Sequence, residues 1–299
     1  VCPIALVLVG SDMCIIYRPT NESISMLVEL ITNSKNPMII TESVGKEVQG
    51  FNNLVTLSEL LAIPVTEATP YYSNFPKTHP LHLGFNPSPY FNETDLVIIM
   101  GSRAPWYPPS AGPVSSTVVA MGETPLKGNM VYQNLLADLY VEGDMTISLG
   151  LLVEALKSGG AHRESKVEER RARWSAEHDK LQERNRASVE AVRSKQPIDP
   201  VWLCAAISEV MPNDTVYSEE TTSHRNAILQ HVGWDEPQRY LHPTGGLGQG
   251  LGLALGAKLA RPNSPVVALM GDGGFLYNPV TQSFGVAGEA NLPLSLIHI

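Results

Sequence analysis

The sequence predicts an α/β protein made of two doubly wound parallel-sheet domains joined by a charged linker helix. Short apolar runs of strand length alternate with stretches of helical spacing, which is typical of parallel sheets with crossover helices. The chain has 299 residues, more than one hydrophobic core usually holds. A charged stretch separates two alternating regions. We therefore expect a central α/β domain over residues 1–160, a linker helix over 161–197 and a second domain over 198–299.

The first region starts its alternation after residue 20. Apolar residues at helical spacing predict a helix over 22–32, and the apolar run 37–41 predicts a short buried strand. The pattern continues with a helix at 53–62, strands at 64–66, 95–100 and 116–121, and a helix at 146–157 that Gly159 and Gly160 end.

Between residues 163 and 195 the charges alternate in sign. Only Val167, Trp174 and Leu181 recur, seven residues apart, as a narrow apolar seam. A seam of this width suits a helix that lies along a surface and requires no partner chain. We expect a solvated linker helix that ends before the segment 197–200, which contains two prolines.

The second region repeats the alternation. Its expected elements are a helix at 201–210, a strand at 214–218, a turn at 219–223, a glycine-rich helix within 244–260, a strand at 265–270, a helix at 279–290 and a strand at 293–299. Gly248, Gly252 and Gly256 fall four residues apart, so we expect another element to pack closely on that helix face.

Two turns of the second region carry residues suited to a phosphorylated ligand. Thr222 and Ser223 precede a helix, where hydroxyls and free backbone N–H groups bind phosphate, although they are also ordinary capping residues. Asp272 follows a buried strand, at the position where open α/β sheets hold ligands. The Asp-Gly pair is equally compatible with a hairpin turn.

Composition and charge argue against several classes of protein. The formal net charge of −9 argues against a nucleic-acid or anionic-membrane surface, so a polyanionic ligand would need a metal. The three cysteines lack C-x-x-C spacing, which excludes a disulfide scaffold or zinc site. The apolar run 4–9 is too short to span a membrane. We expect an intracellular location, cytoplasmic or organellar.

Three features follow one another in the second region: the turn with Thr222 and Ser223, the glycine-rich helix, and Asp272 at the end of a strand. In their order and spacing they resemble the thiamine-diphosphate-dependent 2-oxo acid decarboxylase and acetohydroxyacid (acetolactate) synthase family. The spacing is closest to that of the benzoylformate decarboxylases, and the resemblance covers the chain from about residue 24 onward. It implies thiamine diphosphate and Mg²⁺ as cofactors, C–C bond cleavage or formation on a small 2-oxo acid, and a homodimer or homotetramer.

The resemblance also implies roles for single residues. Asp272 corresponds to the magnesium-binding aspartate, and Thr222 and Ser223 fall on the diphosphate-binding turn. Gly245 matches the residue whose carbonyl accepts the aminopyrimidine amino group, and Leu247 matches the apolar wedge that bends the cofactor. The remaining expected cofactor contacts are the glycines around the aspartate, Gly271, Gly273 and Gly274.

The chain also departs from the family pattern. The family's activating glutamate belongs to an N-terminal domain that the sequence lacks, and its two signature asparagines would fall just past Ile299. We therefore expect a fragment that is inactive alone, and no catalytic residue is assigned. The alternative is a non-catalytic binding or regulatory homologue. A nicotinamide-dependent oxidoreductase is disfavoured because the glycines do not form G-x-G-x-x-G after a strand.

Overall fold

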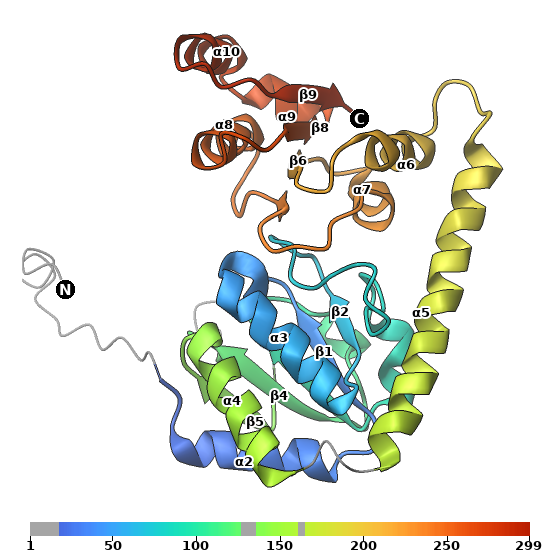
Figure 1. Cartoon of the computed structure of the whole chain (residues 1–299), viewed down its shortest axis with the longest axis vertical. Coiled ribbons are helices and arrows are strands. Elements are labelled where there is room, and N and C mark those ends of the chain that lie inside the picture. The colour runs from blue at the N-terminus through green and yellow to red at the C-terminus, as the bar shows by residue number, and fades with distance from the viewer. Residues whose placement is uncertain (1–17, 127–135, 161–164) are drawn as a thin grey trace, which may run out of the picture.

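The computed structural model describes residues 18–126, 136–160 and 165–299, and within them the chain forms two parallel sheets (Figure 1). The first sheet has the order β2-β1-β3-β4-β5 and the second the order β7-β6-β8-β9. Every pairing between neighbouring strands is parallel. The predicted fold class is confirmed. The apolar run 4–9 lies outside the described residues.

The first sheet is built from short apolar strands whose side chains alternate between its two faces. Its elements are α2 (Asn21–Asn33), β1 (Pro37–Thr41), α3 (Val48–Leu61), β2 (Val65–Glu67), β3 (Leu96–Met100), β4 (Thr117–Gly122), β5 (Leu139–Glu142) and α4 (Met145–Gly159). Three short 3₁₀ helices, Val44–Lys46, Ser88–Glu93 and Pro109–Ala111, lie in the connections.

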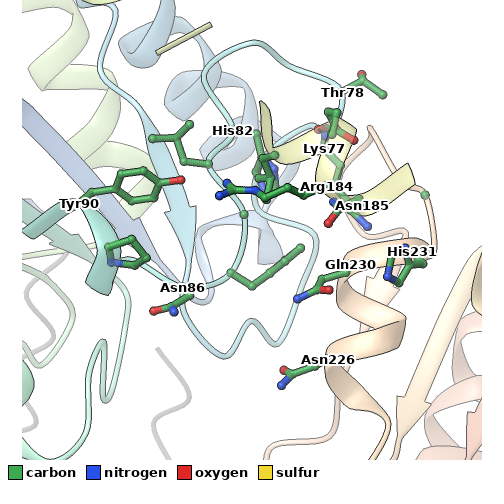
Figure 2. A pocket seen from close by; sticks show the side chains of 17 residues that line it. Lys77, Thr78, His82, Asn86, Tyr90, Arg184, Asn185, Asn226, Gln230 and His231 are labelled. Atoms are coloured by element: carbon green, nitrogen blue, oxygen red, sulfur yellow. Dashed lines mark hydrogen bonds between the residues drawn. The ribbon is translucent and has the colours of Figure 1, made fainter. Parts of the chain in front are cut away.

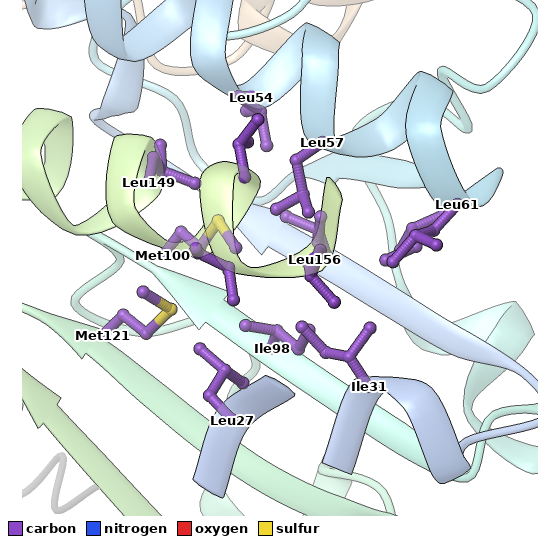
Figure 3. Close-up of a cluster of buried hydrophobic side chains, with 14 of the residues drawn as sticks. Leu27, Ile31, Leu54, Leu57, Leu61, Ile98, Met100, Met121, Leu149 and Leu156 are labelled. Carbon is purple, nitrogen blue, oxygen red and sulfur yellow. The ribbon is translucent and has the colours of Figure 1, made fainter. Parts of the chain in front are cut away.

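One face of this sheet is covered by three helices and the other by the linker. Ile98, Met100 and Met121 point toward α2, α3 and α4, where they meet leucines of those helices (Figure 3). The alternate residues Val97 and Ile99 face the linker helix and the segment after β2, which comprises residues 68–95. Because successive residues of a strand point to opposite faces, burial on both sides requires the continuous apolar runs seen in the sequence.

The linker helix α5 (Ser165–Val192) runs along both halves of the molecule (Figure 1). Val167 and Trp174 of the predicted seam are 1% and 0% exposed, and Trp174 packs into the core on the second face of the first sheet. Leu181 contacts the position of Gly84. The prediction of a charged helix lying along a surface on a narrow apolar seam is confirmed.

The second sheet is enclosed by helices on both faces. Its elements are α6 (Pro200–Val210), β6 (Val216–Glu220), α7 (Arg225–His231), β7 (Tyr240–Leu241), α8 (Gly250–Ala260), β8 (Val266–Met270), α9 (Asp272–Tyr277), α10 (Val280–Glu289) and β9 (Ser295–His298). Residues of α6 and α7 pack with Tyr217, Val267 and Leu269, whereas α8 covers Ala268 and Met270 on the opposite face.

Several sequence predictions need correction. Strand β6 ends at Glu220, so Glu219 and Glu220 belong to the strand and not to the turn. Helix α8 starts only at Gly250. The hairpin alternative for Asp272 is wrong, because β8 pairs in parallel on both sides and Asp272 opens a helix. Strand β5 was not predicted.

The expectation of a closely packed glycine face is also wrong for the described part of this chain. Gly252 and Gly256 have no atom within 4 Å of an added Cβ. Gly248 lies before the helix. A Cβ added at Gly248 would lie 2.6 Å from the carbonyl oxygen of Tyr277. Its φ of +97° is a backbone conformation that glycine adopts without strain.

The segment after β2 joins the two halves. The N–H of Ser73 donates to the carbonyl of Tyr240 at 3.1 Å, and the N–H of His242 donates to the carbonyl of Tyr71 at 2.9 Å. Lys77 reaches farther, to the end of α7, where its Nζ donates to the Leu229 carbonyl at 2.6 Å. Among the described residues, no helix has the length and hydropathy needed to cross a membrane.

Candidate functional site

The order of the second sheet creates a crevice between β6 and β8. From β6 the chain first adds β7 on one side and then crosses to place β8 on the other. Ligands of open α/β sheets bind where the strand order reverses in this way, outside the carboxyl ends of the strands. The turn after β6 carries Thr222 and Ser223, and the turn after β8 carries Gly271 and Asp272. The structure therefore brings the two predicted turns to one edge.

These two turns are in direct contact. The N–H of Gly271 donates to the carbonyl of Glu220 at 3.1 Å. A Cβ on Gly274 would lie 2.8 Å from the same carbonyl oxygen, so only glycine allows α9 to approach β6 this closely. Gly274 is thus buried against the protein, whereas Gly271 and Gly273 are partly exposed.

A cavity of about 360 Å³ opens at this edge. Of the predicted residues, Thr222, Gly245 and Leu247 line it, and the Leu247 side chain is 46% exposed. Ser223 and Asp272 do not line it, although both are exposed at the same edge of the sheet. The other lining residues are Glu220, Thr221, Arg225, His242, Pro243 and Gly246.

Asp272 offers a single exposed carboxylate. It is the first residue of α9, and within the described part of the chain its Oδ1 accepts only the neighbouring N–H of Gly273, at 2.7 Å. No group of three or more His, Cys, Asp or Glu residues among the described ones could hold a metal by itself. Mg²⁺ is commonly bound by one or two carboxylates together with phosphate oxygens and water. This donor set therefore suits a metal that is held jointly with a phosphorylated ligand.

Glu220 holds the start of the glycine-rich helix. Its side chain is 3% exposed, and Oε1 accepts the N–H groups of Gly248 and Gln249 at 2.6 and 3.1 Å. Oε2 accepts the N–H of Gly250 at 2.9 Å. The carboxylate thus occupies the positive end of the helix dipole and satisfies N–H groups that have no partner within the helix.

Asn278 completes this network from the end of α9. Its Nδ2 donates to Glu220 Oε2 at 2.7 Å and to the Gly274 carbonyl at 2.6 Å, while its Oδ1 accepts the N–H of Leu251 at 3.1 Å. Glu220 and Asn278 therefore tie the loop that carries Gly245 and Leu247 to the helix that carries Asp272.

Sequence reasoning missed this network. The need for such an acceptor can be traced to Gln249, the residue that precedes α8, because its side chain makes no capping hydrogen bond. A buried helix start without a capping side chain requires an acceptor from elsewhere. The acidic residues before the hydroxyl turn were candidates for it.

Glu219 organises the other wall of the cavity. It is fully buried and accepts hydrogen bonds from Tyr240 Oη at 2.8 Å and from both the N–H and the hydroxyl of Thr221, at 2.6 and 2.5 Å. His242 Nδ1 lies 2.8 Å from its Oε2, and Arg225 Nε lies 3.4 Å from the same oxygen. The Thr221 hydroxyl is thereby used internally, which leaves Thr222 as the exposed hydroxyl that lines the cavity.

These contacts decide the charge of Glu219. Burial would raise the pKa of this carboxyl, but hydrogen bonds from His242 and Thr221 and the charges of His242 and Arg225 outweigh it and hold the pKa below its ordinary value. Glu219 is therefore ionised, and it fixes His242 and Arg225 at the cavity wall. Arg225 is held from a second side, because its Nη2 donates to the Pro70 carbonyl at 2.6 Å.

Comparison with known proteins identifies the family of this chain. Residues 24–152 match the family described as "Thiamine pyrophosphate enzyme, central domain", and residues 220–299 match "Thiamine pyrophosphate enzyme, C-terminal TPP binding domain". The chain belongs to the thiamine pyrophosphate enzyme family, which confirms the family inferred from the sequence.

Relatives include both decarboxylases and acetolactate synthases. The chain is 26% identical over 275 residues to benzoylformate decarboxylase of Pseudomonas aeruginosa. This alignment covers 87% of the chain and 47% of the decarboxylase. It is 27% identical over 308 residues to the mitochondrial acetolactate synthase catalytic subunit of Aspergillus candidus, in an alignment that covers 94% of the chain and 42% of the subunit. The chain spans about half the length of the curated relatives it matches.

A solved structure supports the fold. The thiamine diphosphate-dependent 4-hydroxybenzoylformate decarboxylase of Rhodococcus jostii RHA1 superposes with a TM-score of 0.72 at 21% identity. The match covers 99% of this chain and 54% of the other.

Proposed function

We propose that this chain carries the diphosphate-binding part of an enzyme that uses thiamine diphosphate and Mg²⁺ to cleave or form a C–C bond of a small 2-oxo acid. The observation that supports it most is the meeting of Thr222, Gly245 and Leu247 at one cavity, on the sheet edge that also carries Asp272. When bound, thiamine diphosphate supplies the carbon nucleophile and the electron sink for this chemistry.

In this proposal the two turns at the sheet edge hold the diphosphate. Asp272 supplies one oxygen ligand to Mg²⁺, and the metal balances phosphate charge that a chain of net charge −9 would otherwise repel. The exposed hydroxyls of Thr222 and Ser223 donate hydrogen bonds to phosphate oxygens. The backbone at Gly271 and Gly273 leaves room for close approach.

The glycine loop would position the organic part of the cofactor. The carbonyl of Gly245 would accept a hydrogen bond from the aminopyrimidine, and Leu247 would pack against the cofactor. Leu247 suits this role because a leucine that is 46% exposed on a cavity wall loses contact with water when a ring covers it. Glu220 and Asn278 act on this loop as positioning residues, since their side chains bond to each other and to the backbone at the start of α8.

We further propose the division into a central domain over 1–160, a linker over 161–197 and a diphosphate-binding domain over 198–299, in a homodimer or homotetramer. The two sheets, with helix α5 between them in the chain, support this division. The choice between decarboxylation and carboligation depends on which acceptor the substrate pocket admits, so the proposal covers both.

Calorimetric titration with thiamine diphosphate tests the proposal. We expect binding in Mg²⁺ that excess EDTA weakens strongly, and an Asp272→Ala variant that binds about 10- to 150-fold more weakly in Mg²⁺, as for loss of a contact to a charged group. Asp179→Ala, an exposed position on α5, is the matched control and should bind as the wild type does. Affinity that ignores both EDTA and the Asp272 substitution would refute the proposed site.

A further inference from the structure

A second cavity lies between the linker helix α5, the segment after β2 and helix α7 (Figure 2). Its volume is about 510 Å³, within the range of small-molecule sites. Both halves of the chain contribute to its walls, and such sites occur preferentially where domains meet. None of the residues proposed to hold the cofactor lines it.

Among the described residues, the wall of this cavity is rich in hydrogen-bond donors and contains no carboxylate side chain. Arg184 on α5 contributes a permanent positive charge, and no aspartate or glutamate is among the lining residues of a chain with net charge −9. Five side-chain amides complete the wall: Asn86, Gln182, Asn185, Asn226 and Gln230. Guanidinium and amide N–H groups without a competing acid are complementary to an oxyanion.

The amides on α7 are available to a ligand. Asn226 and Gln230 are four residues apart and therefore share one face of the helix. Neither side chain makes a hydrogen bond to another residue in the described part of the chain. Across the cavity from them, Arg184 and Asn185 project from α5 (Figure 2), and the Arg184 guanidinium lies beside the hydroxyl of Tyr90.

Two further side chains of the wall, Lys77 and His82, are already fixed by internal contacts. The Nζ of Lys77 donates to the carbonyls of Leu229 and Val232 at the end of α7, and it lies 4.3 Å from the centre of the Trp234 ring. His82 Nε2 lies 3.1 Å from the buried Glu67 carboxylate. Because these groups are occupied, they hold α7 against the segment after β2 and leave recognition to Arg184 and the amides. A wall fixed before binding lowers the ordering cost of a ligand.

We propose that this cavity binds a small organic oxyanion, a molecule that carries a carboxylate or phosphate group. Arg184 pairs with the oxyanion, and the side-chain amides of Asn226 and Gln230 donate hydrogen bonds to it. The inference does not rest on the proposed cofactor chemistry, because the residues of the two cavities are distinct.

Calorimetric titration of the full chain at constant ionic strength tests this inference. The probes are inorganic phosphate and succinate, which separate phosphate from carboxylate recognition, with glycerol as the neutral control. We expect at least one anion to bind, and Arg184→Gln and Asn226→Leu each to weaken that binding at least about tenfold. Arg186→Gln is the matched control, since Arg186 is exposed on the same helix, pairs with Glu183 and does not line the cavity.

A Thr222→Val variant separates this site from the sheet edge, and it should bind the anion as the wild type does. If neither anion binds, the inference is wrong. It is also wrong if Arg184→Gln and Arg186→Gln weaken binding equally, which would indicate non-specific attraction, or if only Thr222→Val abolishes binding. Thermal melting of each variant, expected near the wild-type temperature because these side chains are exposed, excludes unfolding as the cause.

Discussion

Replacing Glu220 by glutamine tests whether one buried carboxylate holds the glycine-rich helix in place. Its Oε1 accepts N–H groups from Gly248 at 2.6 Å and Gln249 at 3.1 Å, while Oε2 accepts donors from Gly250 at 2.9 Å and Asn278 at 2.7 Å. Glutamine keeps the shape of the side chain. It can present its carbonyl oxygen to only one of these two pairs of donors, so its NH₂ group faces the other pair.

The expected loss follows from the number of bonds that fail. A hydrogen bond to a charged acceptor contributes about 1.5–3 kcal/mol, and two of them lose their acceptor. Rotation of the Asn278 amide would restore one bond but would remove the acceptor of the Leu251 N–H. The loss of negative charge at the start of α8 costs about 0.3–1 kcal/mol more. We expect Glu220→Gln to lower the free energy of unfolding by about 3–7 kcal/mol.

Urea unfolding followed by tryptophan fluorescence measures this loss as a lower midpoint at unchanged slope. The control is Glu183→Gln on α5, whose side chain is 72% exposed in an ion pair with Arg186, and which should change stability by less than about 1 kcal/mol. A Glu220→Gln midpoint equal to that of the wild type would refute the reasoning, because the carboxylate would then not support the helix.

Three further predictions concern buried groups. The folded-state pKa of Glu219 lies below its ordinary value of 4.5, so the stability that its carboxylate contributes is complete above about pH 4.5 and is lost as the pH falls further. A Glu219→Gln variant should therefore show a weaker dependence of the urea midpoint on acid pH. A dependence identical to that of the wild type would contradict this. Burial lowers the pKa of Lys77 from 10.5 to about 7, so the unfolded chain binds a proton that the folded chain lacks between these values. Stability relative to a Lys77→Met variant should therefore rise from pH 7 to 10, and a constant difference would argue against the shift. Trp174→Ala removes a side chain that is 0% exposed and should cost about 3–5 kcal/mol in chemical denaturation, whereas a loss below 1 kcal/mol would mean that the seam does not anchor the linker helix.

The central strands were predictable because both of their faces are buried. Strand β1 has the predicted bounds, since every residue of Pro37–Thr41 is buried and the apolar run is continuous. Strand β5 was missed because it lies at the sheet edge and only Val141 of its four residues is buried, so it leaves no apolar run.

The acidic end of β6 was misplaced for a different reason. Two consecutive glutamates normally indicate exposed chain, because an unpaired buried charge is costly. Here the compensating groups come from positions far along the chain: Tyr240 and His242 for Glu219, and the start of α8 for Glu220. A single sequence contains no local pattern for such pairings. Thr222 was selected from its place before a helix, whereas Gly245 and Leu247 were selected only through the family resemblance.

The most direct test of the proposed site is a crystal structure with thiamine diphosphate and Mn²⁺ in place of Mg²⁺, read by the anomalous signal of the metal. We predict a manganese peak within about 2.5 Å of an Asp272 carboxylate oxygen, with the diphosphate between the turns after β6 and β8. A peak at another carboxylate, or a cofactor bound away from this edge, would contradict the account.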